Sequence, residues 1–180
     1  MSKTWVVADP HFSHWGVCKF MAKNGVDKLR PWTDPDEMNS VLIKNWNDTV
    51  DDKDRVYLLG DVAMNKKDFM KAVPYLKGRI VLVKGNHDQE KLSFYTPWFD
   101  DIRAYVVKKG IIMSHIPIHP GSLSRWQFNI HGHLHDGFVR DANGNPDPRY
   151  ICVSMEHTDY RPLDLQTILD KVVHAQPRES

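Results

Sequence analysis

Three short apolar runs in the first half of the chain each end in a cluster of Asp, His or Asn. The runs are 4–8 (TWVVA), 55–59 (RVYLL) and 79–83 (RIVLV), and their β-branched residues indicate buried strands. The clusters that follow them are Asp9-Pro10-His11, Gly60-Asp61 and Gly85-Asn86-His87-Asp88. Because sites in open α/β sheets form at the carboxyl ends of strands, the repetition predicts one composite site.

Histidine is concentrated in the second half. Five of the ten histidines lie between positions 115 and 135: His115, His119, His131, His133 and His135. In an extended segment alternate residues point to the same side, so His133 and His135 can converge on one small volume. This spacing is easier to explain by metal binding than by packing, whereas His119 and His131 are expected to be non-ligands.

The remaining pattern predicts a mixture of helices and strands. Asp34-Pro35-Asp36-Glu37 has the form of a helix start, with Asp34 as the N-cap. Further helices are expected within 12–33, where a short helix is followed by a loop, over 66–76, where Pro74 would strain the helix, and from about Asp164. Further strands are expected as a hairpin of 103–107 and 111–114 and as single strands at 127–130 and 150–154. No repeat or linker interrupts the pattern, which predicts a single α/β domain over residues 1–180.

Composition narrows the class of protein. The chain has 180 residues, 41% of them hydrophobic and 26% charged, as in an ordinary globular protein, and a net charge of +1 argues against general attraction to nucleic acid. Cys18 and Cys152 form no C-x-x-C motif, which argues against a zinc knuckle or a disulfide framework. With neither a signal-peptide pattern nor a run of about 20 apolar residues, we expect a cytoplasmic protein without membrane association.

The clusters contain seven candidate metal ligands: Asp9, His11, Asp61, Asn86, His115, His133 and His135. Carboxylate and imidazole together suit Mn²⁺, Fe²⁺ or Zn²⁺ better than Ca²⁺, which prefers oxygen alone. Seven ligands exceed the needs of one ion, so a pair of divalent ions that share a bridging carboxylate is the simplest interpretation.

In their order and spacing these motifs resemble the calcineurin-like metallophosphoesterases. The resemblance covers about residues 4–157, and five fragments in order, with a strand before the first three, make it specific. It implies two mixed β-sheets packed as a sandwich flanked by helices, an α/β (α+β) fold. It also implies that Asp9, His11 and His135 hold the first metal, that Asn86, His115 and His133 hold the second, and that Asp61 bridges both. In addition it implies that His87 faces the phosphate and that Asp88 orients the His87 ring.

The function implied is hydrolysis of a phosphodiester, nucleotide or nucleic-acid-derived, by a hydroxide that bridges two divalent ions. Mn²⁺ is the preferred ion, with Fe²⁺, Zn²⁺ or Ni²⁺ as alternatives. Many relatives have Gly-Asp-x-x-Asp, and the protein phosphatases then have Arg, but positions 64 and 65 here are Met and Asn. A compact, uncapped bacterial or phage-type phosphodiesterase therefore fits better than a protein phosphatase. A phosphomonoesterase of the same fold, or a non-catalytic subunit that binds metal or nucleic acid, is the alternative.

Candidates for substrate binding are weaker. His14, three residues after His11, could assist His87, and Arg30 or Arg125 could grip a phosphate with its guanidinium fork. For the two arginines a solvated surface position explains the sequence equally well. Trp46 is spaced to face the core from its helix.

Overall fold

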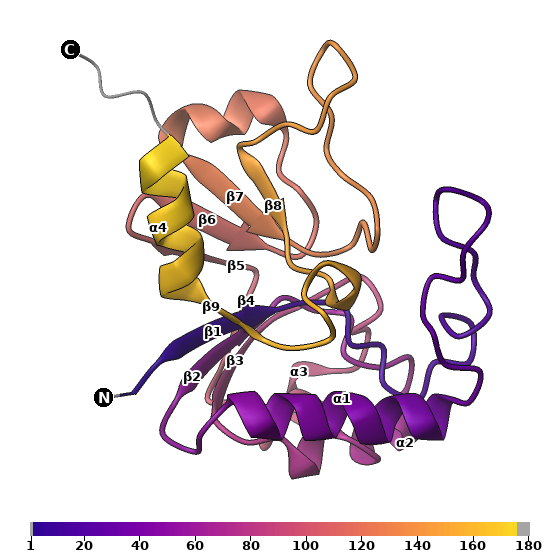
Figure 1. Cartoon of the computed structure of the whole chain (residues 1–180). Helices are drawn as coiled ribbons and strands as arrows, with labels where there is room; N and C mark the ends of the chain where they lie inside the picture. Colours follow the sequence, from indigo (N-terminus) through magenta and orange to yellow (C-terminus); the bar gives the residue numbers. More distant parts are fainter. Residues whose placement is uncertain (1, 176–180) are drawn as a thin grey trace.

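Two mixed β-sheets form the centre of the molecule (Figure 1). The structure, a computed structural model, describes residues 2–175, with side chains to residue 170. The first sheet has the order β4-β3-β2-β1-β9, with β1 (Thr4–Val7), β2 (Arg55–Leu58), β3 (Arg79–Val83), β4 (Asp101–Arg103) and β9 (Leu163–Asp164). The second has the order β5-β6-β7-β8, with β5 (Tyr105–Lys108), β6 (Ile111–Ser114), β7 (Phe128–His131) and β8 (Tyr150–Cys152).

Strand direction explains where polar side chains gather. In the first sheet β1 to β4 are parallel and only β9 is antiparallel. In the second sheet β6, β7 and β8 are parallel and β5 is antiparallel. Parallel strands end at the same edge, so the segments that follow β1, β2 and β3 meet at one edge, and those that follow β6 and β7 meet at another. The predicted sandwich of two mixed sheets with helices is confirmed.

Both faces of the first sheet are covered. Along β2, Val56 and Leu58 pack into a core under the helices, while Tyr57 and Leu59, the residue after the strand, pack into the core shared with the second sheet. This alternation accounts for the nearly continuous apolar runs of these strands, because a strand covered on both faces has no solvent side. The core between the sheets is completed from the second sheet by residues such as Met113 and Ile130.

Helices cover the outer face of the first sheet and one side of the sandwich. In Figure 1, α1 (Pro35–Thr49) runs below the first sheet, and α4 (Leu165–Ala175) lies beside the strands. As predicted, Asp34 caps α1: its side chain accepts the N–H of Asp36 at 2.9 Å. Trp46 is fully buried in the core beneath this helix, as its spacing predicted. The shorter helical elements are α2 (Lys66–Met70), η1 (Val73–Tyr75), α3 (Leu92–Tyr95), η2 (Pro120–Arg125) and η3 (Met155–His157).

Three expectations for local structure are wrong. Residues 12–33, all within the described range, form turns, bends and isolated bridges instead of a short helix. The helix expected over 66–76 ends at Met70, and a separate 3-10 turn begins at Val73 before Pro74, since proline cannot supply the N–H that a continuous helix needs. The strand expected over 103–107 is divided at Ala104 between β4 of one sheet and β5 of the other.

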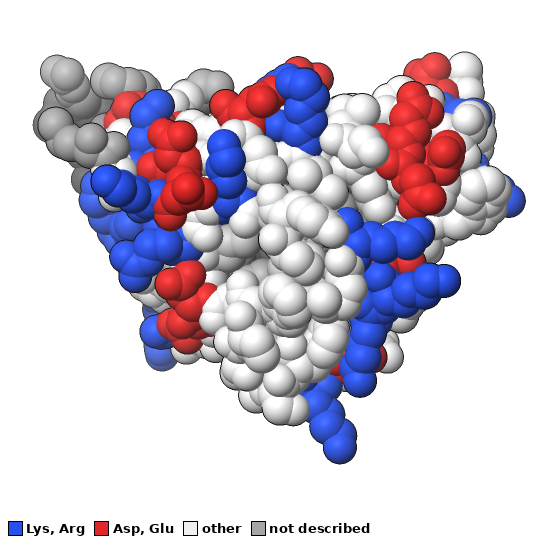
Figure 2. Space-filling view, turned by 90° about the horizontal axis from the view of Figure 1, so that it is seen from below, with Lys and Arg blue, Asp and Glu red and all other residues white. Residues whose placement is uncertain are grey.

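The surface seen from below the first sheet has a broad uncharged centre. Figure 2 shows Lys, Arg, Asp and Glu placed mainly around its edges. The middle of this face therefore offers no charge that would attract a phosphate backbone. None of the helices within residues 2–175 is both long enough and apolar enough to cross a bilayer.

Candidate metal centre

The predicted ligands lie together where the two sheets meet. Asp9 and His11 follow β1, Asp61 follows β2, and Asn86 follows β3. His115 follows β6 of the second sheet, and His133 and His135 follow β7. Two groups have one donor atom from each residue, all within 4.8 Å of one another: Asp9, His11 and Asp61, and Asp61, His115 and His133. Asp61 belongs to both groups, which is the position that a bridging carboxylate would need.

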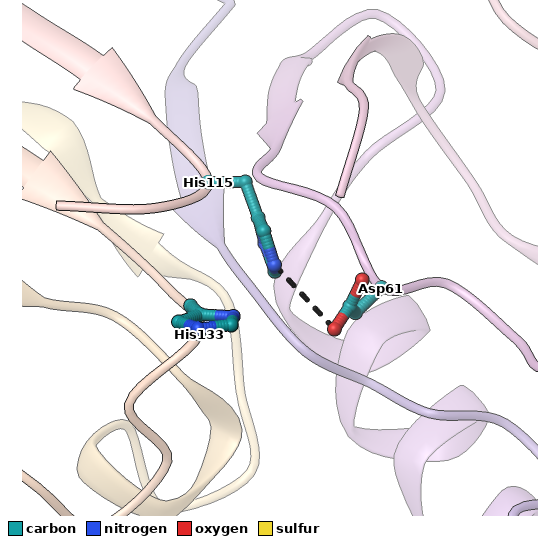
Figure 3. Close-up of side chains that lie close together, drawn as sticks. All are labelled: Asp61, His115 and His133. Carbon is teal, nitrogen blue, oxygen red and sulfur yellow. Dashed lines mark ion pairs between the residues drawn. The ribbon is translucent and has the colours of Figure 1, made fainter. Parts of the chain in front are cut away.

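Asp61 is held between histidines from different strands. Its Oδ2 lies 3.6 Å from Nε2 of His11 and 3.4 Å from Nε2 of His115. Figure 3 shows the Asp61 carboxylate and the His115 ring facing each other, with His133 beside them. Burial alone would raise the pKa of Asp61, but the hydrogen bond and charge of His115 lower it below its usual value. Asp61 is therefore ionised at neutral pH.

In its neutral form the His115 ring would point Nε2, without a proton, at two oxygen atoms. Its Nδ1 lies 2.8 Å from the carbonyl oxygen of Leu59, which can only accept, so Nδ1 carries the proton in the neutral ring. Nε2 then faces Oδ1 of Asn86 at 2.8 Å and Oδ2 of Asp61 at 3.4 Å. Three acceptor atoms without a donor among them require a proton or a cation, so this arrangement fits a metal ion.

Asp9 and His11 present buried atoms without partners. Oδ2 of Asp9 accepts the Ser154 hydroxyl at 2.6 Å and the His133 N–H at 2.8 Å, whereas its Oδ1 has no hydrogen bond to any described residue. Neither ring nitrogen of His11 has one either. Burial raises the pKa of Asp9 to about 6 and, followed by the charge of Arg30, lowers the pKa of His11 well below its usual value. Since buried polar atoms are rarely left unpaired, these atoms also fit a cation ligand role.

A buried ion pair of Glu156 and Arg30 contacts His135 on the Nδ1 side of its ring. Oε1 of Glu156 lies 3.2 Å from Nδ1 of His135 and accepts Nε–H of Arg30 at 2.8 Å. The guanidinium also donates to the carbonyl oxygens of Asp9 at 2.6 Å and Pro10 at 2.7 Å. Glu156 therefore fixes the ring with Nε2 free, which is how carboxylates behind metal-binding histidines act. Because His135 stacks on His11 with ring centres 5.1 Å apart, it lies beside the Asp9 group.

The backbone at the ligands is unusual. Nine described residues other than glycine have positive φ, and five of them are candidate ligands: Asp9, His11, Asp61, His133 and His135, with φ between 47° and 70°. Such conformations cost free energy for residues with a side chain and concentrate at functional sites. The neighbouring glycines are also constrained, since a Cβ on Gly85 would collide with Asp61, and one on Gly132 would collide with Asp9.

Asp88 does not have the role that the resemblance implied. Its Oδ2 accepts the N–H groups of Gly85 at 2.8 Å and Asp61 at 2.9 Å, and its Oδ1 accepts that of Val62 at 3.0 Å. The carboxylate is thus used to hold the backbone of the Asp61 loop rather than to orient the His87 ring. His87 is half-buried, with its ring centre 5.6 Å from that of His11, so it lies beside the ligands.

The substrate-binding candidates have different positions. Arg30 is fully buried against Glu156, so neither a surface position nor a phosphate contact applies to it. His14 is partly exposed, with its ring centre 5.3 Å from that of His11, and Arg125 is an exposed residue of η2. Of the two expected non-ligands, His119 caps η2, and Nδ1 of His131 faces the carbonyl oxygen of Gly132 at 2.7 Å.

Sequence reasoning did not identify Ser154 and Glu156, which hold Asp9 and His135 in place. The available signal was their position: they follow β8, a strand that runs parallel to β7. The rule that parallel strands deliver functional residues at their carboxyl ends applied to β8 as well.

The fold and this cluster define an α+β sandwich protein with Asp and His side chains gathered where its two sheets meet. The chain belongs to the same family as the uncharacterized protein MJ1445 of Methanocaldococcus jannaschii, to which it is 33% identical over 173 residues, 94% of this chain and 90% of that protein. It is also similar to the Gene 66 protein of Mycobacterium phage D29, at 25% identity over 197 residues, 91% of this chain and 94% of the phage protein.

The crystal structure of the protein of unknown function AQ665 from Aquifex aeolicus has a similar fold. Its TM-score is 0.68 at 23% identity, over 96% of this chain and 100% of that chain. No protein-family model matches the sequence.

Proposed function

We propose that this protein is a phosphoesterase of the calcineurin-like type that uses two divalent metal ions to hydrolyse a phosphodiester. The observation that carries the proposal is the shared Asp61, which belongs to both groups of donor atoms. A single structural ion would need only one such group. A site that retains a half-buried histidine next to the ligands also has a group available for proton transfer.

The ligand atoms divide between the two proposed ions by their contacts. Asp9 and His11, with His135 beside them, would hold one ion, and Asn86, His115 and His133 would hold the other. Ions held there would bind phosphoryl oxygens and lower the pKa of water, with Mn²⁺ the preferred ion and Fe²⁺, Zn²⁺ or Ni²⁺ as alternatives. The unpaired oxygen of Asp9 and the unpaired nitrogens of His11 support this division.

The protein's own residues then have distinct roles. His87 would donate a proton to the alkoxide that leaves, since it lies beside the ligands and is not enclosed by them. His14, half-buried next to His11, would contact the substrate on the side of the leaving group, as His87 does. Asp88 would act indirectly, because its three hydrogen bonds from backbone N–H groups fix the loop from which Asp61 extends.

A cytoplasmic location is part of the proposal. Both cysteines, Cys18 and Cys152, are free thiols, and Cys18 is buried among apolar side chains. Free thiols are typical of proteins in reducing compartments, which supports this location.

Hydrolysis of bis-p-nitrophenyl phosphate by the Mn²⁺-loaded protein, with metal content measured on the same sample, tests the proposal. Asp61→Asn should abolish turnover and lower the amount of bound metal, because both donor groups lose a charged oxygen. The matched control is Asp52→Asn, an exposed aspartate outside both donor groups, which should retain turnover. Metal-loaded protein that hydrolyses no phosphate monoester or diester would disprove the proposal.

The role of His87 has a separate signature. His87→Asn should slow esters with aliphatic leaving groups by about 10²–10⁴-fold, the usual contribution of a general acid. The p-nitrophenyl ester should be slowed far less, because p-nitrophenolate leaves without needing a proton. An equal loss for both kinds of ester would show that His87 acts in some other way.

A further inference from the structure

Two pockets flank the segment 84–90, which carries Asn86 and His87. We name them the Tyr105 pocket and the His87 pocket. Asn86 lines the first, of about 410 Å³, together with His115. His87 lines the second, of about 190 Å³, and the two pockets share no lining residue. Since Asn86 and His87 are consecutive, each pocket opens beside the candidate metal centre from a different side of this segment.

The two pockets differ in chemistry. The His87 pocket is lined by Asn65, Gln89 and Glu90 together with Phe69, Phe94 and Tyr95, and its exposed surface is mainly polar because Phe69 and Tyr95 are buried. The Tyr105 pocket is mainly apolar, with walls from Ala104, Tyr105, Ile112, Ile116 and Ile118. Its Ser114 hydroxyl already donates to the carbonyl oxygen of Ile116 at 2.7 Å.

Lys84 also lines the Tyr105 pocket, but its charged amino group lies near residues of the His87 pocket. Its Nζ donates to the carbonyl oxygen of Glu90 at 3.4 Å and lies 5.4 Å from the ring centre of Tyr95. Both of those residues line the His87 pocket. Tyr105 and Ile116, by contrast, are 55% and 53% exposed, so the wall of the Tyr105 pocket offers open apolar surface. Apolar surface inside a concave pocket suits an apolar or aromatic ligand group.

We propose that the Tyr105 pocket binds a planar aromatic group, an aryl ring or a nucleobase, on the ester arm that is not cleaved. This inference rests on the proposed phosphodiesterase function. The leaving arm must lie toward His87 to receive a proton, so the retained arm lies toward Asn86 and His115, which line the Tyr105 pocket. The volume is within the range of small-molecule sites, and an exposed tyrosine offers a stacking surface. During hydrolysis of a monoester, whose one arm is the leaving group, this pocket would stay unfilled.

Two diesters with the same leaving group test the inference: phenyl 4-nitrophenyl phosphate and methyl 4-nitrophenyl phosphate, with Mn²⁺-loaded protein. In both, water adds at phosphorus, the bond to the 4-nitrophenolate oxygen breaks, and the phenyl or methyl phosphate monoester is released with a proton to solvent. The phenyl diester should be preferred in kcat/KM by about tenfold or more, as expected for stacking and burial of one ring. Tyr105→Ala should remove most of this preference and leave the methyl diester unaffected, whereas Tyr105→Phe should retain it.

Tyr75→Ala is the matched control, because Tyr75 is 64% exposed and lies outside both pockets. If Tyr105→Ala does not fold, as judged by circular dichroism, Ile116→Ser serves the same purpose. A preference for phenyl that survives in the folded pocket variant would overturn the inference.

Equilibrium binding separates the pocket from the chemistry. Titration calorimetry with phenylphosphonate and methylphosphonate on the Mn²⁺-loaded protein should show the same Tyr105-dependent preference. If no diester is hydrolysed but this preference is found, the proposed function fails and the pocket assignment stands. If methylphosphonate binds as well as phenylphosphonate, the pocket assignment fails whatever the activity.

Discussion

Replacing Glu156 with glutamine removes one charge from a buried network and leaves its shape almost unchanged. The Glu156 side chain is 4% exposed, and Oε1 contacts Nε of Arg30 at 2.8 Å and Nδ1 of His135 at 3.2 Å. Burial alone would raise the pKa of Glu156, but the charge of Arg30, followed by the hydrogen bond of His135, lowers it from 4.5 to about 2. At 1.36 kcal/mol per pKa unit this difference corresponds to about 3 kcal/mol of folding free energy.

A second argument gives a similar magnitude. Arg30 is fully buried, and without the Glu156 carboxylate it would be a buried cation whose remaining partners, the carbonyl oxygens of Asp9 and Pro10 and the sulfur of Met38, carry no charge. Removing one member of a buried ion pair costs about 3–5 kcal/mol. We therefore expect Glu156→Gln to lower the free energy of unfolding by about 3 kcal/mol at pH 7.

The assay is urea unfolding of the metal-free protein between pH 7 and pH 3. Because the pKa of Glu156 is lower in the folded state, its contribution is complete above about pH 4.5 and is lost as the pH falls toward 2. The gap between wild type and Glu156→Gln should therefore narrow in acid. The control is Glu90→Gln, whose partner Lys66 lies 3.2 Å away at the surface, and which should change stability by less than about 1 kcal/mol. A gap below about 0.5 kcal/mol at pH 7, or one that persists unchanged in acid, would refute this reasoning.

The remaining predictions concern the loops that support Asp61 and one acid-sensitive group elsewhere. Gly85→Ala should reduce metal binding, measured by calorimetry, because its Cβ would displace Asp61. Asp88→Asn should lower the unfolding free energy by about 2 kcal/mol in urea unfolding, since an amide retains only one oxygen for the three N–H groups; unchanged stability would show that these hydrogen bonds do not hold the Asp61 loop. The pKa of Asp54 is below its usual value, because hydrogen bonds from Trp5 and two backbone N–H groups outweigh the effect of its burial. The wild type therefore gains stability from Asp54 above about pH 4 and loses it in more acidic solution. Asp54→Asn should remove this pH-dependent stability, as urea unfolding at a series of pH values would show.

The sequence predicted the elements that have a local cause. β1, β2 and β3 are continuous apolar runs because both of their faces are buried, and α1 begins at Pro35 because Asp34 caps it. The segment 12–33 has local turns, such as the one that Asn24 forms with Asp27, but distant residues fix its path. The N–H of Ser13 donates to Asn39 at 2.7 Å, and the N–H of Lys23 donates to Asp136. No local periodicity could indicate contacts of this kind.

The candidate site also contains residues that the sequence identified and residues that it did not. Its seven candidate ligands were visible as residue types that follow strands, and the structure brings them together. The residues behind them were not visible, because their partners are far away in sequence: Arg30 meets Glu156 across 126 positions, and Ser154 meets Asp9 across 145. Arg30 has the composition of a surface or phosphate-binding residue, and only the closed sandwich shows that it neutralises a buried carboxylate.

The positive φ angles at Asp9, His11, Asp61, His133 and His135 show what determines the geometry of the site. Each such conformation costs about 1–3 kcal/mol and persists only where the surrounding structure enforces it. Here that structure is made of protein contacts: the N–H of His133 binds Asp9, and the N–H groups of His11 and Asp61 bind a carbonyl oxygen and the Asp88 carboxylate. These hydrogen bonds join one protein group to another, so the folded chain itself contributes to the position of each candidate ligand.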